Sequence, residues 1–251
     1  MDKKVEYYNI VNELFKSILN DEKESIEKAA EVMAKAIMED RLIHVVGTGG
    51  HSNMGAEELF WRAGGLVPIN PLLDAGISLS NGAKHSNIME RTPGYGIAVM
   101  KNYDFTPGDP IIIVNAYGIN AMTIDVAMEA KKMGLITIGI TSTSFAKMVP
   151  KDHPSRHPSG KNLYEIVDIF IDSHLPLGDA VIKFDNFDQK VAPTSTLVNT
   201  FTLNLLVVET VNQLLKKGVK PPVWVSANMP GGDEANKEYE RKYFGRIKHL
   251  R

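Results

Sequence analysis

A glycine turn holds the densest group of residues that could do chemistry. It reads Gly-Thr-Gly-Gly-His-Ser over residues 47–52, follows an apolar run that starts at Arg41, and opens into a helical pattern over residues 53–63. Glycines let the backbone bend tightly, and the first N–H groups of a helix lack internal partners and carry partial positive charge. This arrangement suits anions, so we expect a phosphate or a sugar hydroxyl at Thr48, Gly49, Gly50 and Ser52.

The main alternative for this turn is the dinucleotide-binding pattern G-x-G-x-x-G. Gly47 and Gly49 supply its first two glycines, but Ser52 stands where the third belongs. The nearest downstream acid at a predicted strand end, Asp74, also lies further along than the roughly 20 residues expected for a ribose-binding carboxylate. A hydroxyl at the helix start favours a monophosphate instead.

Carboxylates and histidines near the turn could act as general acids and bases. Glu57 and Glu58 follow on the predicted helix, where consecutive side chains project about 100° apart, so one can face the cleft while the other faces solvent. We select Glu58 as the candidate base; the alternative is a solvated glutamate near the positive end of the helix dipole. His51 lies in the turn itself and either donates to a ligand oxygen or caps the helix.

A polar stretch over residues 82–96 carries a second set of candidates. It is too long and too mixed in composition for a simple connector. His85 is a candidate acid, Glu90 a second acid–base carboxylate and Arg91 an anion clamp. Glu90 and Arg91 could instead pair with each other or with a neighbouring subunit.

Three later segments offer weaker signals. His153 and His157 suggest a metal site, but prolines at 154 and 158 prevent their sharing one helix face, so we expect no metal and interpret the loop as a lid or a plain surface segment. Ser195 precedes the last long helix and suits capping and ligand contact equally. The polar stretch 228–236 covers a neighbour's site or forms a turn, and the basic stretch 241–251 is expected to be a solvated tail without affinity for nucleic acid.

The bulk composition limits the classes of protein. The chain has 251 residues, of which 43% are hydrophobic and 23% charged, with a net charge of −2 and no cysteine. We expect one domain, with N-terminal helices over 1–40, an α/β core over 41–217 and a tail over 218–251. The charge gives no general attraction to nucleic acid or anionic membranes, and the absence of cysteine excludes disulfides and thiolate chemistry. With no apolar signal region and no run near the roughly 18 apolar residues of a membrane span, we expect a cytoplasmic protein without a cofactor.

The apolar pattern along the chain predicts the elements that must position these residues. Helical spacing occurs over 4–20, 22–39, 121–133 and 197–217; strands are predicted near 66–69, 110–115, 135–141, 166–173 and 180–184. Two of the strands are apolar without alternation, as in a parallel sheet covered on both faces. The fold class is therefore a doubly wound α/β sandwich. Ligands of such sheets bind at the carboxyl ends of strands, which adds Asn115, Asn120, Thr141 and Ser142 to the candidates.

Three segments at these strand ends resemble the sugar isomerase (SIS) domain family. They are residues 43–65, residues 135–142 (Leu-Ile-Thr-Ile-Gly-Ile-Thr-Ser) and residues 192–196 (Ala-Pro-Thr-Ser-Thr), and the resemblance runs from Val5 to Tyr239. Within the family, the chain is most similar to a phosphosugar-binding branch that resembles phosphoheptose isomerases. The resemblance implies a five-stranded parallel sheet, a homodimer or homotetramer with sites near subunit interfaces, and a sugar phosphate ligand. It also implies a functional Glu58, because sedoheptulose-phosphate isomerases of the family carry a similar Glu-Glu-Leu.

One loop departs from the family pattern. The family's usual second phosphate loop is Ser-x-Ser-Gly-x-Ser/Thr, whereas this chain has Asn-Ala-Tyr-Gly-Ile-Asn over residues 115–120. Asn120 can cap the next helix, but Tyr117 fills space that a phosphate needs. Two interpretations remain: the phosphate is held by Gly49, Gly50, Ser52, Thr141 and Ser142, or the ligand is a differently placed phosphosugar or an unphosphorylated sugar.

Two hypotheses of different class follow. The first is a sugar-phosphate isomerase or epimerase that works through an enediol, with Glu58 as base and His85 or His51 as acid. The second is a non-catalytic phosphosugar sensor that binds in the same cleft and signals through its oligomer contacts.

Overall fold

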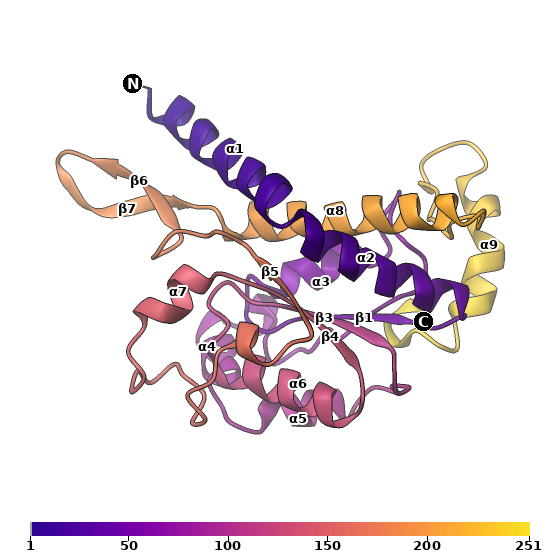
Figure 1. The fold of residues 1–251 in the computed structure, drawn as a ribbon, viewed down its shortest axis with the longest axis horizontal. Helices are drawn as coiled ribbons and strands as arrows, with labels where there is room; N and C mark the ends of the chain where they lie inside the picture. The colour runs from indigo at the N-terminus through magenta and orange to yellow at the C-terminus, as the bar shows by residue number, and fades with distance from the viewer. Residues whose placement is uncertain (1) are drawn as a thin grey trace.

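A five-stranded parallel sheet organises the chain, which a computed structural model describes over residues 2–251 (Figure 1). The strands lie in the order β2-β1-β3-β4-β5. Their bounds are β1 Ile43–Gly47, β2 Ile69–Pro71, β3 Pro110–Val114, β4 Ile136–Thr141 and β5 Ile169–Asp172. The order reverses at β1, so the carboxyl ends of β1 and β3 flank the switch point where such sheets bind ligands. The predicted doubly wound α/β fold is confirmed.

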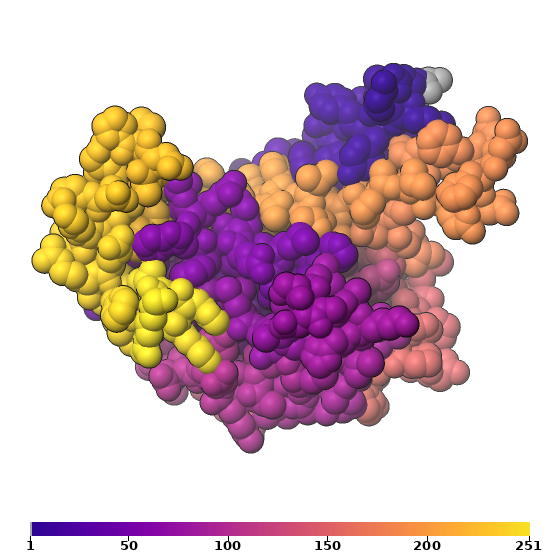
Figure 2. All heavy atoms as spheres, turned by 180° about the vertical axis from the view of Figure 1, so that it is seen from behind, coloured from indigo at the N-terminus to yellow at the C-terminus, as the bar shows by residue number. Residues whose placement is uncertain are grey.

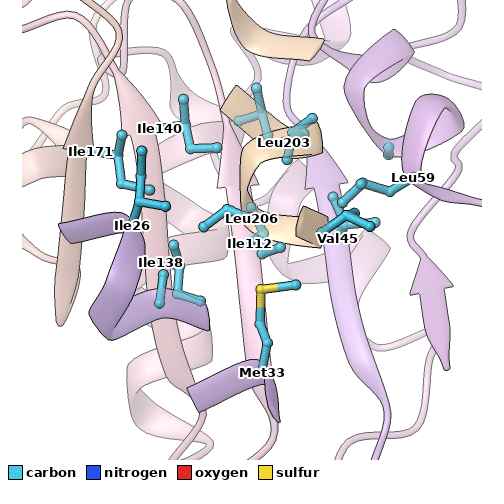
Figure 3. Close-up of a cluster of buried hydrophobic side chains, with 14 of the residues drawn as sticks. Ile26, Met33, Val45, Leu59, Ile112, Ile138, Ile140, Ile171, Leu203 and Leu206 are labelled. Carbon is cyan, nitrogen blue, oxygen red and sulfur yellow. The ribbon is translucent and has the colours of Figure 1, made fainter. Parts of the chain in front are cut away.

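Helices cover both faces of the sheet. One face is packed by α2 (Lys23–Met38), α3 (Asn53–Leu59) and α8 (Ser195–Lys216), and the other by α5 (Tyr95–Met100) and α6 (Ala121–Lys132). Figure 3 shows Met33 and Leu206 meeting Ile112 on the first face. The next residue along the strand, Ile113, packs against the second face. Because alternate residues enter opposite layers, every residue of β1 and β3 is buried, which explains why these strands are apolar except for His44. The ring of His44 is hydrogen-bonded to the side chains of Asp109 and Asn70.

Two predicted strands are displaced or shortened in the structure. The strand predicted over 66–69 overlaps β2 only at Ile69, and Leu66 forms an isolated antiparallel bridge with Val223. β5 begins three residues later than predicted, because the 3₁₀ turn over 163–165 continues through residues 166 and 167, whose N–H groups both donate to the carbonyl of Leu163. Both shifts leave the order of the elements unchanged.

Helix α1 and a β-hairpin project together from the sheet. Helix α1 covers Lys3–Asp21, and β6 (Ala180–Phe184) pairs antiparallel with β7 (Phe187–Pro193), a strand that the sequence pattern did not predict. The Tyr7 hydroxyl donates to the carbonyl of Pro193 at 2.8 Å and joins the two. Figures 1 and 2 both show this pair extending beyond the main body. The hairpin leads directly into α8, so its base, with Asp179 and Pro193, borders the ligand side of the sheet.

The C-terminal segment is packed, and the prediction of a solvated tail over residues 241–251 is wrong. Helix α9 covers Gly232–Tyr243, and Tyr243 and Ile247 are buried with Val67 and Trp224. Figure 2 shows this segment, in yellow, packed against the main body. The turn after α9 keeps Ile247 beside Tyr243, because the Ile247 N–H donates to the Tyr243 carbonyl at 2.9 Å, while Arg246 reaches Asp40 at 3.0 Å. The dense charge of this segment concealed a narrow apolar face.

None of the helices within residues 2–251 is both long and apolar enough to cross a membrane.

The remaining helices are short. They are α4, Ala83–Glu90, and α7, Thr143–Met148.

Candidate functional site

A cavity of about 270 Å³ lies at the carboxyl ends of β1 and β3. The glycine turn, the end of α4, the loop after β3 and the start of α8 form its walls. The structure brings the following predicted residues together around it: Gly49, Gly50, His51, Ser52, Glu90, Asn115, Asn120 and Ser195. The cavity therefore collects side chains from four parts of the chain at the switch point of the sheet.

The glycine turn brings backbone and hydroxyl donors to the cavity. A Cβ at Gly47 would lie 1.9 Å from the carbonyl oxygen of Ser52, so the turn closes tightly only with glycine there. The Ser52 hydroxyl makes no hydrogen bond within residues 2–251, and it lines the cavity as a free donor. His51 is exposed at the rim.

Glu90 places a carboxylate against the glycine turn. Its helix, α4, is held by Ser86, which is buried and donates to the carbonyl of Ile77 at 2.8 Å. A Cβ on Gly49 would lie only 2.7 Å from Glu90 Oε2, so glycine is needed for this approach. Burial raises the pKa of Glu90, although the Arg91 charge and the Gly50 N–H act in the opposite direction. A carboxylate with a raised pKa that faces a cavity is a candidate general base.

The amides of Asn115 and Asn120 join two loops. Asn115 Oδ1 accepts from the N–H groups of Tyr117 (3.0 Å) and Gly118 (2.8 Å), and both amide nitrogens donate to the carbonyl of Thr48 at 3.1 Å. Asn120 Oδ1 also caps α6 by accepting from the Thr123 N–H at 2.9 Å. Both asparagines line the cavity, but their hydrogen bonds hold the loop after β3 against the glycine turn.

Asp179 is a cavity residue that the sequence analysis missed. It adopts a left-handed conformation with φ of 63° at the start of the hairpin. Its carboxylate accepts from the N–H of Thr194 (2.9 Å) and from the N–H and hydroxyl of Ser195 (both 2.7 Å). Asp179 thereby caps α8 across the hairpin. The available signal was the turn pair Gly178 and Asp179 before β6, together with Thr-Ser at residues 194–195 before a long helix.

Three predicted phosphate-binding residues lie behind the cavity wall. The hydroxyl of Thr48 meets that of Thr123 at 2.5 Å, Thr141 Oγ1 donates to the carbonyl of Ala116 at 3.4 Å, and Ser142 Oγ donates to the carbonyl of Leu175 at 2.8 Å. All three side chains are buried. The loop after β3 covers the end of β4, so these hydroxyls support the cavity without facing it.

Glu58 and His85 are not brought to the cavity. Glu58 lies near the end of α3, where it faces α8 and contacts Arg62 Nε at 3.4 Å and Asn204 Nδ2 at 3.2 Å. His85 is exposed on α4, about 140° around the helix from Glu90. The carboxylate that faces the cavity is therefore Glu90 and not Glu58.

The loop over residues 150–160 is tied down. Arg156 donates to the carbonyls of Val149 (2.8 Å) and Pro150 (2.9 Å) and to Asn162 (2.9 Å), and His157 Nε2 lies 3.3 Å from Asp125. These contacts occupy Arg156. Within residues 2–251, no group of three or more His, Asp or Glu side chains is arranged to hold a metal.

A second cavity of about 370 Å³, here called the Arg91 chamber, adjoins the first. The two share Glu90, Tyr117 and Asn120 as common wall, and the second adds Arg91 and His153. The Tyr117 ring packs on Phe145 with centroids 4.0 Å apart. Burial and the nearby carboxylates of Asp179 and Glu90 raise the pKa of the Tyr117 phenol, which stays neutral.

Comparison with known sequences identifies relatives over the full fold. Residues 6–142 match the SIS domain family. A protein of Geobacillus thermodenitrificans named UPF0309 protein is 39% identical over 242 residues, which are 96% of this chain and 95% of the relative. A UPF0309 protein of Thermoanaerobacter pseudethanolicus is 38% identical over 250 residues, 98% of this chain and 99% of the relative.

Solved structures share the architecture. A phosphoheptose isomerase from Neisseria gonorrhoeae matches with a TM-score of 0.55 and 12% identity, over 83% of this chain and 95% of that one. A phosphoheptose isomerase from Francisella tularensis matches with a TM-score of 0.51 and 16% identity, over 83% and 96% of the two chains. At these identities the likeness shows a common fold.

Proposed function

The chain belongs to the SIS domain family, and from this premise we propose that it is a sugar-phosphate isomerase or epimerase that uses Glu90 as its base. One observation carries the proposal: a carboxylate whose pKa is raised by burial lies against a glycine turn in a cavity of about 270 Å³. The phosphoheptose isomerases that share the fold support a sugar phosphate as the ligand.

The reaction needs a base, a donor and a return of the proton. The Glu90 carboxylate takes the proton from the carbon next to the ligand's carbonyl, and the electron pair forms the carbon–carbon double bond of an enediolate. The hydroxyl of Ser52 and the ring of His51 donate to the enediolate oxygen. The isomer forms when Glu90 returns the proton to the former carbonyl carbon, while the neighbouring hydroxyl passes its proton through His51 to the former carbonyl oxygen. The epimer forms when a water molecule instead protonates the opposite face of the carbon that lost its proton, and the hydroxide left behind takes up the proton held by Glu90.

Glu90 takes the role first assigned to Glu58 because of where each is held. Glu58 is engaged by Arg62 and Asn204 on the opposite side of α3, whereas Glu90 lines both cavities. Proton transfer requires the base within hydrogen-bond reach of the proton. Two carboxylates line the cavity, Glu90 and Asp179, but Asp179 already accepts from Thr194 and Ser195 at the start of α8, so we assign the base to Glu90.

The test is proton NMR in D₂O on the protein mixed with a panel of aldose and ketose phosphates and the same sugars without phosphate. The proposal predicts loss of a carbon-bound proton signal next to the carbonyl of at least one sugar. If no proton exchanges while a sugar raises the melting temperature, the protein is a sensor and the catalytic proposal fails.

A specific observation favours the sensor as second candidate. The hydrogen bonds of Asn115, Asn120 and Asp179 are all made within the protein, which leaves few polar groups free to act on a ligand. A sensor would signal through subunit contacts.

We propose that the protein forms a cytoplasmic homodimer or homotetramer. Helix α1 and the hairpin expose large apolar side chains on their projecting surfaces, including Tyr8, Phe184 and Phe187. Large exposed apolar side chains on neighbouring elements are typical of a protein–protein interface.

A further inference from the structure

We infer that the ligand's phosphate is seated in the Arg91 chamber, beyond Tyr117, and that the central cavity holds the sugar. The inference rests on the proposed function, because it assumes a sugar phosphate. The sequence pattern alone predicts the phosphate at the glycine turn, and this inference moves it away from there.

The central cavity already contains protein acceptors at each place where backbone N–H groups gather. The Glu90 carboxylate lies against Gly49 and Gly50. Asn115 Oδ1 accepts from the two N–H groups of the loop after β3, and Asp179 accepts from the N–H of Ser195 at 2.7 Å. A phosphate would have to displace one of these groups to reach the N–H donors behind it.

Charge also opposes a phosphate in the central cavity. Glu90 and Asp179 both line it, and no lysine or arginine of residues 2–251 does. The Arg91 chamber shares Glu90 but sets the charge of Arg91 against it. Like charges brought together in a partly desolvated space repel strongly. Sugar hydroxyls, in contrast, can donate to both carboxylates, so the cavity matches the polyhydroxyl part of the ligand.

In the adjoining Arg91 chamber, Arg91 supplies the positive charge that the central cavity lacks. Its guanidinium makes no hydrogen bond or ion pair within residues 2–251, whereas each of the other arginines makes at least one there. A free guanidinium presents a planar fork of donors that matches a phosphate. Arg91 follows Glu90 directly, so one ligand can place its carbonyl carbons at the base and its phosphate at the guanidinium.

His153 adds an oriented donor to the same chamber. Its Nδ1 accepts from the N–H of Ser155 at 3.2 Å and lies 2.6 Å from the Ser155 hydroxyl. In the neutral ring the proton is therefore on Nε2, which is left as a donor. Phe145, Val149 and Leu177 form an apolar wall beside it, which leaves Arg91 and His153 as the polar donors of the chamber's outer part.

The seat can be tested with inorganic phosphate as the probe, by titration monitored with phosphorus NMR. Arg91→Gln should weaken phosphate binding at least tenfold and His153→Gln severalfold. Arg62→Gln removes the same charge outside both chambers and should bind phosphate as the wild type does, as should Ser52→Ala at the glycine turn. Wild-type affinity in Arg91→Gln, loss of binding in Ser52→Ala, or no binding of phosphate by the wild type would each overturn the seat.

A second readout separates this inference from the proposed function. In the D₂O experiment, Arg91→Gln should lose the preference for the phosphorylated form of a sugar while still exchanging the proton of the unphosphorylated form. Proton exchange with the same phosphate preference in Arg91→Gln would refute the seat and leave the isomerase intact. Phosphate binding that depends on Arg91, without exchange of any sugar, would support the seat and refute the isomerase.

Discussion

Glu90 combines two properties that oppose each other. Burial disfavours its ionised form, and this raises its pKa and costs the folded protein stability when the carboxylate is charged. The same burial makes the carboxylate a stronger base toward a carbon acid. Burial of the Glu90 carboxylate therefore lowers the stability of the folded protein while it favours catalysis.

The first prediction follows from this competition. Because the pKa of Glu90 is higher in the folded than in the unfolded state, its favourable contribution is complete at low pH and is lost as the pH rises through the folded-state value. Glu90→Gln removes the charge, so it should melt at a higher temperature than the wild type at neutral pH, and the difference should shrink toward acid pH. Thermal unfolding across a pH series measures both.

The matched control is Glu58→Gln, which removes the same charge from a glutamate paired with Arg62. Its melting temperature should not exceed that of the wild type at neutral pH. A Glu90→Gln protein that melts below the wild type there would show that the Glu90 charge is stabilised in the fold.

Site residues could be predicted from the sequence only where they directly follow a predicted strand. Gly49, Gly50 and Ser52 follow β1 directly, so the turn pattern located them at the cavity. Glu58 could not be oriented, because the rotation of α3 depends on its packing against α8, far along the chain. Asp179 reaches the cavity only because the hairpin folds back to α8, a long-range contact that no local pattern reports.

At the scale of elements, the approach of α4 to the glycine turn determines where the base lies. A Cβ at Gly49 would lie 2.7 Å from Glu90 Oε2, and Gly49 does not need a left-handed conformation. Gly49→Ala should therefore displace Glu90 and lower the rate of proton exchange by up to ~10²-fold while the protein remains folded. Gly245→Ala, where a Cβ meets nothing within 4 Å, is the control and should keep the wild-type rate.

The cap on α8 gives the next prediction. Asp179→Ala removes the acceptor for two backbone N–H groups and the Ser195 hydroxyl, and should lower the free energy of unfolding by about 1–2 kcal/mol. Asp188→Ala, on the exposed part of the same hairpin, should change it by less than about 0.5 kcal/mol. Chemical denaturation measures both, and equal stability of the two variants would mean that the cap contributes little.

Elements differ in how well their sequence predicts them. β1 and β3 are buried on both faces and are apolar apart from His44, so they were located correctly. β7 is exposed, with Asp, Gln and Lys in its sequence, and its pairing with β6 could not be predicted from apolar content. Helix α9 carries so many charges that its buried face, which ends at Tyr243, was not recognised.

For the whole molecule, the projecting pair of α1 and the hairpin leads to a prediction of assembly. Tyr8 is 65% exposed and Phe187 49%, so a second copy that covers this surface would bury both. In size-exclusion chromatography with light-scattering detection, the double variant Tyr8→Lys with Phe187→Lys should have a lower mass than the wild type. Met148→Lys, at a residue 63% exposed on α7, should leave the wild-type mass unchanged. An unchanged mass in the double variant would place the interface elsewhere.

The overall architecture could be predicted further than the site. Parallel strands separated by helices long enough for crossovers admit few arrangements, so the doubly wound sheet followed from the sequence pattern and is confirmed. A cavity lies at the edge where the pattern placed the ligand. The polar contacts at that edge depend on distances of a few ångström between loops far apart in the chain. Such distances are fixed by the packed core and not by local spacing.

The most direct test of the account compares proton exchange by Glu90→Gln and Glu58→Gln, on the sugar that the wild type enolises in D₂O. We predict that Glu90→Gln loses ~10²–10⁴-fold in exchange rate, because the base is gone, and that Glu58→Gln stays near the wild-type rate. Full exchange in Glu90→Gln, or its loss in Glu58→Gln alone, would contradict the assignment of Glu90 as the base.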